Sequence, residues 1–261
     1  MVKHFSHHTQ NDSQLLEAIA KNFRGATIAI NGEDGEPPLI SIVPIIFRPE
    51  IGEHGQIDFH LSKKNAMVER LLKGGAKATI TILGPNCHIS PGWYDKRFPN
   101  KDSDRSETAP TYNYVSATMK GTIAPMEPAG LIGHLTRQVK ENEATAGENR
   151  WSLKEIKPAI LVDKDKGWPT GIVGFSMPIE QLDVTTKISH TPSRPNEPDA
   201  NVSGIVKGLR ERKAYGDEAM ATIMESDRGT IASLIEGLNA VGLVSKSVLP
   251  ESKKVAGMGG R

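Results

Sequence analysis

"KATITILGPNCHISPGWY" (residues 77–94) and "APTYNYVSATMKGTIAPM" (residues 109–126) enclose a polar, charged stretch, and this arrangement decides the fold. Both outer segments contain alternating apolar and polar residues, which is typical of β-strands. Pro91-Gly92 turns the first strand out into a loop, and residues 109–114 bring the chain back into the next strand. We therefore expect two strands with aromatic side chains where the chain leaves and re-enters the sheet.

Composition limits the possible classes of protein. The 261 residues suit one large domain, or one domain with an appended helical part. With 32 basic and 31 acidic residues, the net charge of +1 argues against a wholly basic surface built for nucleic acid. The single cysteine, Cys87, excludes an intramolecular disulfide and fits a reducing compartment. No apolar run is long enough to span a membrane, and the first residues lack the apolar core of a signal peptide. We expect a cytoplasmic protein with no membrane association.

The rest of the chain is strand-rich up to about residue 126 and becomes helical near its end. Hydrophobic spacing and turn residues predict helices near residues 13–24, 65–74, 129–144, 201–213, 216–226 and 229–243, and strands near residues 26–47, 56–62 and 170–189. The fold class expected is mainly β with flanking helices (α+β), closed as an antiparallel barrel that removes sheet edges. We divide the chain into a barrel domain (residues 1–190), a C-terminal helical segment (191–245) and a flexible tail (246–261).

Two lysines, Lys63 and Lys64, lie between a predicted strand end and a predicted helix start. Cations at a helix N-terminus are unfavourable by roughly 0.3–1 kcal/mol each because of the helix dipole. An anion such as a phosphate, held by both ammonium groups and the free amides of the first turn, would reverse that sign. The alternative is a pair of solvated lysines on a turn. Asn65 is most simply a helix cap.

Aromatic rings gather on both sides of the polar loop in a chain with only 5% aromatic residues. Ring faces beside small polar groups suit a flat heteroaromatic ligand, which needs stacking and edge hydrogen bonds. A core cluster under the loop is the equal alternative. The rings are Trp93, Tyr94, Tyr112 and Tyr114, and the neighbouring polar residues are Ser90, Thr111 and Asn113.

Other kinds of chemistry have little support. No histidine pair has metal-ligand spacing, so we expect no metal site, and His60 and His88 are interpreted as structural. The sequence has no dinucleotide-binding or phosphate-binding glycine motif and no serine-hydrolase elbow. Cys87 is interpreted as a small buried residue. The basic residues of the late helices, including Arg210 and Arg212, lie among acidic ones and are interpreted as a solvated face.

Five motifs in one order carry a resemblance that covers about residues 1–225. The chain resembles the FMN-binding negative transcriptional regulator family, the PaiB-type proteins, which belongs to the FMN-binding split-barrel superfamily. The motifs are "HLSKKN" (60–65), "GPNCHISPGWY" (84–94), "APTYNY" (109–114), "GIVGF" (171–175) and "KISHT" (187–191).

This resemblance implies a split β-barrel with flanking helices, usually a homodimer with two FMN sites at the subunit interface. Here it predicts such a barrel with a C-terminal helical extension, in a regulator that binds FMN. Lys63, Lys64 and Asn65 would lie on the phosphate side. Ser90, Trp93, Tyr94, Thr111 and Asn113 would surround the flavin. No residue is assigned a catalytic role.

The chain departs from the family pattern at several positions. Ile42 replaces a polar histidine, His88 replaces the motif tyrosine, and Tyr112 replaces the motif tryptophan. The charged loop 95–109 is longer than usual and is a candidate lid or dimer contact. The helical part after residue 226 exceeds the usual end. The sequence therefore predicts the fold more firmly than it predicts the identity of the ligand.

Three functions follow from these observations. The first is an FMN-binding transcriptional regulator, although no recognition helix for DNA stands out. The second is a flavin-dependent oxidoreductase that acts on a small molecule with NAD(P)H, since one fold hosts many functions. The third is a non-catalytic module that binds another cofactor, such as haem.

Overall fold

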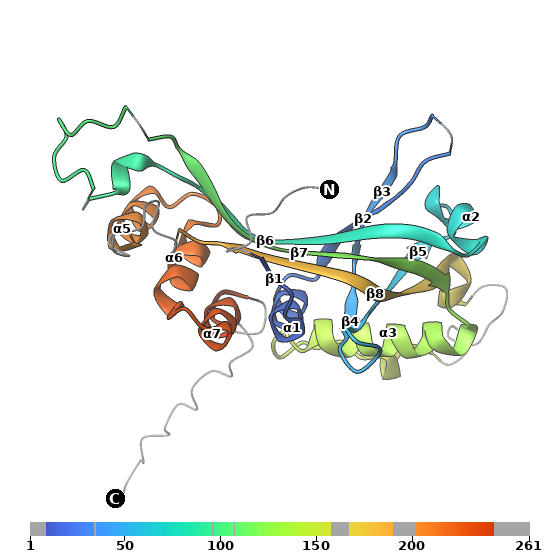
Figure 1. Cartoon of the computed structure of the whole chain (residues 1–261). Coiled ribbons are helices and arrows are strands. Elements are labelled where there is room, and N and C mark those ends of the chain that lie inside the picture. The colour runs from blue at the N-terminus through green and yellow to red at the C-terminus, as the bar shows by residue number, and fades with distance from the viewer. Residues whose placement is uncertain are drawn as a thin grey trace, which may run out of the picture.

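A computed structural model of the chain describes residues 9–33, 35–95, 97–106, 108–157, 167–189 and 202–242. Within these residues, eight strands form one antiparallel sheet in the order β3-β2-β6-β7-β8-β5-β4, and β1 pairs with β8 (Figure 1). The strands are β1 (Thr9–Gln10), β2 (Gly25–Ile30), β3 (Leu39–Pro44), β4 (Ile46–Arg48), β5 (Gln56–Ser62), β6 (Ala76–Ile89), β7 (Thr111–Pro125) and β8 (Ile172–Lys187).

The predicted stretch forms the centre of the sheet. Strands β6 and β7 pair from Ala76 opposite Ile123 to Ile89 opposite Thr111, with one irregularity between Leu83 and Asn86. Residues 111–125 form one continuous strand, β7, whose register with β8 shifts at Gly121. A β-carbon at Gly121 would lie 2.2 Å from the carbonyl oxygen of Pro178, so only glycine fits where β7 and β8 approach.

The sheet curls into a half-barrel that is not closed by hydrogen bonds between its two end strands, β3 and β4. Alternating residues of the strands fill the interior because successive side chains point to opposite faces. Ile28, Phe59, Ile80 and Phe175 are fully buried there, and the rings of Phe59 and Phe175 stack at 5.6 Å. The expected fold class, mainly β with flanking helices in a split barrel, is confirmed, whereas the expectation of a closed barrel that removes sheet edges is wrong for the described strands.

Helices cover one side of this sheet and its ends. In Figure 1, α1, α3 and α7 lie below the strands, α5 and α6 lie at the end near the β6–β7 loop, and α2 lies at the other end. Asp12 caps α1, because its carboxylate accepts the N–H groups of Gln14 and Leu15 at 2.8 and 2.9 Å. The helices are α1 (Ser13–Asn22), α2 (Met67–Leu72), α3 (Pro128–Glu143), α5 (Val202–Arg212), α6 (Asp217–Ser226) and α7 (Ile231–Val241).

The C-terminal helices share the hydrophobic core of the sheet. Leu209 of α5, Met220 of α6 and Leu238 of α7 are buried in the same cluster as the strand residues. The Nδ2 of Asn22 on α1 donates to the Oδ1 of Asn239 on α7 at 2.8 Å. The predicted boundary at residues 190–191 and the predicted tail, residues 246–261, lie outside the described residues.

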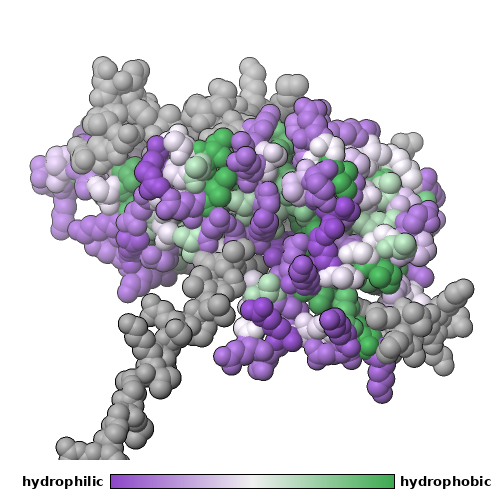
Figure 2. All heavy atoms as spheres, turned by 90° about the horizontal axis from the view of Figure 1, so that it is seen from below, coloured by the Kyte–Doolittle hydropathy of each residue, from purple (hydrophilic) through white to green (hydrophobic). Residues whose placement is uncertain are grey.

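The upper side of the sheet in Figure 1 carries no helix over its centre. On this face the register places Ile42 beside Thr27 and Thr81, with Leu83 next along β6. Ile40, Ile42 and Leu83 expose 64%, 78% and 57% of their surface. We call these three residues and their neighbours the open sheet face. By contrast, the helical side, seen from below in Figure 2, is mostly hydrophilic with small separate apolar patches. Across the described ranges, no helix is long and apolar enough to cross a membrane.

Candidate functional site

The lysine turn, Lys63–Lys64–Asn65, follows β5 and precedes α2. The N–H of Lys63 donates to the carbonyl of Gly171 at 2.9 Å, which ties the turn to the start of β8. Both lysine side chains are exposed, and neither makes an ion pair with any described residue. Two uncompensated ammonium groups therefore lie side by side, as an anion site requires.

Asn65 holds this turn in shape. Its Oδ1 accepts the N–H of Met67 at 2.9 Å, and its Nδ2 donates to the Oγ of Ser41 on β3 at 2.9 Å. The helix α2 begins one residue later than predicted, with Ala66 at its N-cap. The prediction of Asn65 as the helix cap is therefore wrong by one residue, although its side chain makes a local hydrogen bond at the start of α2 and fixes the turn to the strand that carries Ile42.

A second group, the aromatic tip, lies where β6 ends and β7 begins. It consists of Ser90, Trp93, Tyr94, Thr111 and Asn113. The Oγ of Ser90 accepts the N–H of Gly92 at 3.2 Å and caps the short helix η2 (Pro91–Trp93). The Oγ1 of Thr111 accepts a hydrogen bond from the Nζ of Lys187 at 2.5 Å. Burial raises the pKa of the Tyr94 phenol, and Arg97 opposes this effect.

Trp93 packs against α5. A β-carbon at Gly208 would lie 2.4 Å from the indole ring, so the helix approaches the ring with backbone alone. The guanidinium of Arg212, one turn later, lies 4.9 Å from the centre of the Trp93 ring. Residues four apart lie on one helix face, so α5 covers one side of the indole. Arg212 is an exposed residue, as its interpretation as part of a solvated face predicts, but it also packs on Trp93, which lies far away in the sequence.

Asn113 is fully buried in this chain. The Oγ of Ser189 donates to its Oδ1 at 2.9 Å, and its Nδ2 lies 3.7 Å from the sulfur of Met224 on α6. Both partners of Asn113 are distant in the sequence, so no local sequence pattern predicts these contacts. Asn113 faces a packed helix here, whereas a role beside a flavin stays a prediction.

The positions that depart from the family pattern lie on exposed surface at both groups. Ile42 lies on β3 beside Ser41, the partner of the lysine turn. Tyr112 is 58% exposed, and its ring meets that of His88 edge-on, with centres 5.8 Å apart. The Nδ1 of His88 lies 3.3 Å from the Nη1 of Arg212. His88 therefore has structural partners, as predicted, but they lie beside exposed aromatic surface.

The charged loop between the strands has a core of its own. Phe98 is buried, and the guanidinium groups of Arg97 and Arg105 lie 5.3 and 5.6 Å from its ring centre. Cys87 is buried on β6, and this burial raises its pKa to about 11. A thiol with this pKa is a poor nucleophile, which agrees with the predicted packing role. In the part of the chain that the structure describes, no cluster of three metal-binding side chains occurs.

The lysine turn and the aromatic tip lie at opposite ends of the central strands (Figure 1). Helix α2 leads directly into the start of β6 at Ala76, whereas Ser90 follows its end at Ile89. At about 3.3 Å per residue, the 14 residues of β6 separate the two groups by roughly 40 Å. One chain therefore cannot bring all eight predicted residues to one flavin.

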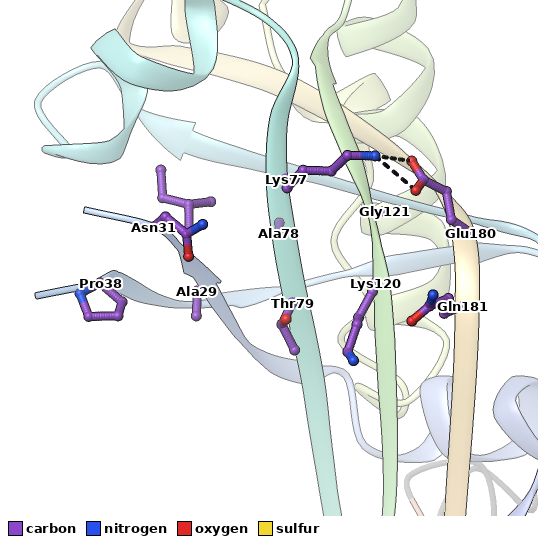
Figure 3. Close-up of a pocket in the computed structure, with 11 residues that line it drawn as sticks. Ala29, Asn31, Pro38, Lys77, Ala78, Thr79, Lys120, Gly121, Glu180 and Gln181 are labelled. Carbon is purple, nitrogen blue, oxygen red and sulfur yellow. Dashed lines mark hydrogen bonds and ion pairs between the residues drawn. The ribbon is translucent and has the colours of Figure 1, made fainter. Parts of the chain in front are cut away.

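A depression of about 600 Å³ lies on the open sheet face (Figure 3). Thr79 on β6, Lys120 on β7 and Gln181 on β8 form a row across its floor. Lys77 crosses its upper rim to Glu180 with two contacts of 3.0 and 3.1 Å. None of the eight predicted residues lines this depression.

Comparison with known proteins identifies a family for most of the chain. A family model described as "Putative FMN-binding domain" matches residues 4–181, which is more than half of the chain. Among curated proteins, no match was found.

Several solved structures are similar at low identity. The FAD and heme binding protein from Mycobacterium smegmatis is 15% identical, with 75% of this chain and 79% of that chain covered and a TM-score of 0.47. The flavocytochrome Anf3 from Azotobacter vinelandii is 13% identical, with coverages of 77% and 78% and a TM-score of 0.49. HutZ, the heme storage protein from Vibrio cholerae, is 12% identical, with coverages of 65% and 92% and a TM-score of 0.36.

Proposed function

The chain belongs to this family of FMN-binding domains, and we propose that it works as a homodimer whose two FMN sites each take residues from both subunits. FMN supplies the redox chemistry when it is bound, and the protein supplies binding, orientation and electrostatics.

The separation of the lysine turn from the aromatic tip carries this proposal. The two groups are roughly 40 Å apart in one chain, because the strand β6 lies between them. A two-fold axis through the middle of the sheet would place the lysine turn of one subunit beside the aromatic tip of the other. Two equivalent sites would then form from one interface, as isologous association requires.

The residues fit FMN at both ends. A phosphomonoester carries about −1.5 to −2 charges near neutral pH, which matches the two free ammonium groups of Lys63 and Lys64. At the aromatic tip, Trp93 is only partly buried and Tyr112 is 58% exposed, so both residues offer ring surface. Lys187 and Thr111 add a polar edge beside them.

The open sheet face supports dimerisation. Ile40, Ile42 and Leu83 expose branched apolar side chains on a sheet surface without a covering helix, and exposed apolar patches mark interaction sites. This face lies between the two groups. Its association with a second copy would cover the apolar residues and bring the two halves of each site together.

Substitution of Ile42 tests the proposal. We expect Ile42→Glu to be monomeric in light scattering and to lose at least tenfold in FMN affinity, because a buried charge would disrupt the apolar contact. Ile132→Glu is the matched control, since Ile132 is an exposed isoleucine on α3, on the helical side. A monomeric Ile42→Glu protein that binds FMN as tightly as the parent would refute a shared site.

The finer proposal is a regulatory role of the PaiB type, supported by the ordered motifs from "HLSKKN" to "KISHT". Regulation of this kind would act without a basic recognition surface, because the net charge is only +1. Gel shifts with genomic promoter fragments at several salt concentrations test direct contact with DNA. Rapid bleaching of bound FMN by NADH or NADPH would instead favour the oxidoreductase alternative.

A further inference from the structure

A groove of about 360 Å³ separates α3 from the outer face of strands β4, β5 and β8. Its lining is polar and charged, and it contains none of the residues of the lysine turn or the aromatic tip. The lining residues are Arg48, Gln56, Asp58, Pro125, Met126, Glu127, Gly130, Gly133, His134, Arg137 and Ser176.

A buried carboxylate forms the floor of this groove. Asp58 is 3% exposed, and its Oδ1 accepts a hydrogen bond from the Nε2 of Gln56 at 2.6 Å. Its Oδ2 forms an ion pair with the Nη1 of Arg48 at 3.7 Å, which is longer than a hydrogen bond, while the Nε of Arg48 donates to Glu50 at 2.9 Å. Burial raises the pKa of Asp58. This carboxylate has fewer donors than a buried anion needs.

A buried histidine in the wall also lacks a partner. The Nε2 of His134 lies 3.1 Å from the Nδ1 of His60, which accounts for one ring nitrogen. The Nδ1 of His134 is buried and has no hydrogen-bond partner in the described part of the chain, although the residue is only 3% exposed. A buried polar group without a partner is destabilising unless something binds it.

Two glycines of α3 line the groove at positions where the structure has room for a side chain. Gly130 lies in the first turn of α3 and Gly133 one turn later, and glycine is less favourable than alanine in a helix. A β-carbon at Gly133 would meet nothing within 4 Å, and one at Gly130 would meet only Met126 at 3.6 and 3.9 Å. Packing within the chain therefore does not require these glycines, whereas a ligand close to the helix backbone would.

We propose that this groove binds a small zwitterion of the amino-acid class, with its ammonium group on Asp58 and its carboxylate on Arg137. Arg137 is half-buried on α3, one turn beyond Gly133, and makes no ion pair with another described residue. The ammonium group supplies the donors that Asp58 lacks. The Nδ1 of His134 takes up a further hydrogen bond from the ligand.

The charges of the groove exclude simpler ligands. Arg48 and Arg137 repel a purely cationic molecule, and Asp58 and Glu127 repel a purely anionic one. A zwitterion can pair its ammonium group with the carboxylates of the groove and its carboxylate with the guanidinium groups. The site is separate from the proposed flavin site, because Asp58 precedes Lys63 by five residues, or roughly 16 Å along β5.

Calorimetric titration of the full chain with each of the twenty common amino acids tests the proposal, with propionate and ethylamine as single-charge probes. We expect at least one amino acid to bind saturably and both single-charge probes to bind at least tenfold more weakly. If no amino acid binds, or if propionate or ethylamine binds equally well, the proposal is wrong.

Substitutions locate the binding in the groove. Arg137→Gln removes the carboxylate partner and Gly133→Leu fills the space, so each should weaken binding at least tenfold. Gly133→Ala should remain folded with a raised melting temperature, and Thr136→Ala, on the exposed side of α3, should bind like the parent. FMN affinity should not change in any of the four. Unchanged amino-acid binding in both Arg137→Gln and Gly133→Leu would overturn the assignment.

Discussion

The guanidinium of Arg212 lies 4.9 Å from the centre of the Trp93 ring and forms two hydrogen bonds, of 2.8 and 2.5 Å, with the carboxylate of Asp217. A residue of the C-terminal segment thus holds the aromatic tip of the sheet. The same guanidinium reaches His88 on β6 at 3.3 Å. The C-terminal helices therefore position the residues that we assign to the flavin site.

Removal of Arg212 should cost more stability than removal of a neighbouring arginine. The Asp217 carboxylate is only 1% exposed, so Arg212→Ala leaves a buried charge without its cation, at a cost of about 3 kcal/mol. Urea unfolding measures this loss. Arg210→Ala, on the same helix, removes an exposed pair with Glu225 and should have little effect. Equal effects of the two substitutions would contradict the structural role of Arg212.

Replacement of glycine by alanine should change the stability of the protein in opposite directions in α5 and in α3. Gly208→Ala places a methyl group 2.4 Å from the Trp93 ring, so α5 or the indole must move, and we expect a loss of about 1–3 kcal/mol. Gly133→Ala meets no neighbour within 4 Å and should stabilise α3 by up to about 1 kcal/mol. Thermal unfolding of both variants checks the signs. Stabilisation by Gly208→Ala would show that Trp93 does not pack on α5 in solution.

The lysine turn should determine the affinity for the phosphate of FMN. Replacement of both Lys63 and Lys64 by alanine removes two charge-assisted contacts, and we expect at least a tenfold weaker FMN affinity by fluorescence titration. Lys73→Ala combined with Lys207→Ala removes the same charge elsewhere and is the control. Riboflavin, which lacks the phosphate, should bind the parent and the Lys63/Lys64 variant equally. An unchanged FMN affinity in that variant would refute the phosphate assignment.

Acid should weaken the fold through the buried histidine pair. Burial, and secondarily His60 and Arg137, lower the pKa of His134 from 6.5 to about 4. Between these values the unfolded chain binds a proton that the folded chain does not, so stability falls as the pH falls through this window. The loss from pH 7.5 to pH 5 is about 2 kcal/mol for this one group.

Urea unfolding at the two pH values measures this dependence. His134→Gln should be less stable at pH 7.5 but lose less on acidification than the parent. The raised pKa of Asp58 acts in the opposite direction, because its folded form takes up a proton first, so the comparison with His134→Gln is needed to isolate the histidine. An identical pH dependence in parent and variant would show that His134 does not carry the effect.

Local patterns were sufficient for much of the fold. Alternation in residues 77–83 and 114–125 predicts the central strands, because a half-buried strand repeats every two residues. The position of α2 was also predicted to within one residue, since the side chain of Asn65 forms a local hydrogen bond with Met67 at its start. Glycine and proline marked the turns for the same reason, because each constrains the backbone where it stands.

The sequence by itself thus determined most elements of this protein and its membership of the family of FMN-binding domains. The tertiary structure alone decided which residues meet. Arg212 reads as one of several solvated charges until α5 is placed on Trp93, and the contact of His134 with His60 joins residues 74 positions apart. Only the length of β6 separates the lysine turn from the aromatic tip. Periodicity reports which face of an element is buried, whereas the neighbour on that face depends on how distant elements pack together.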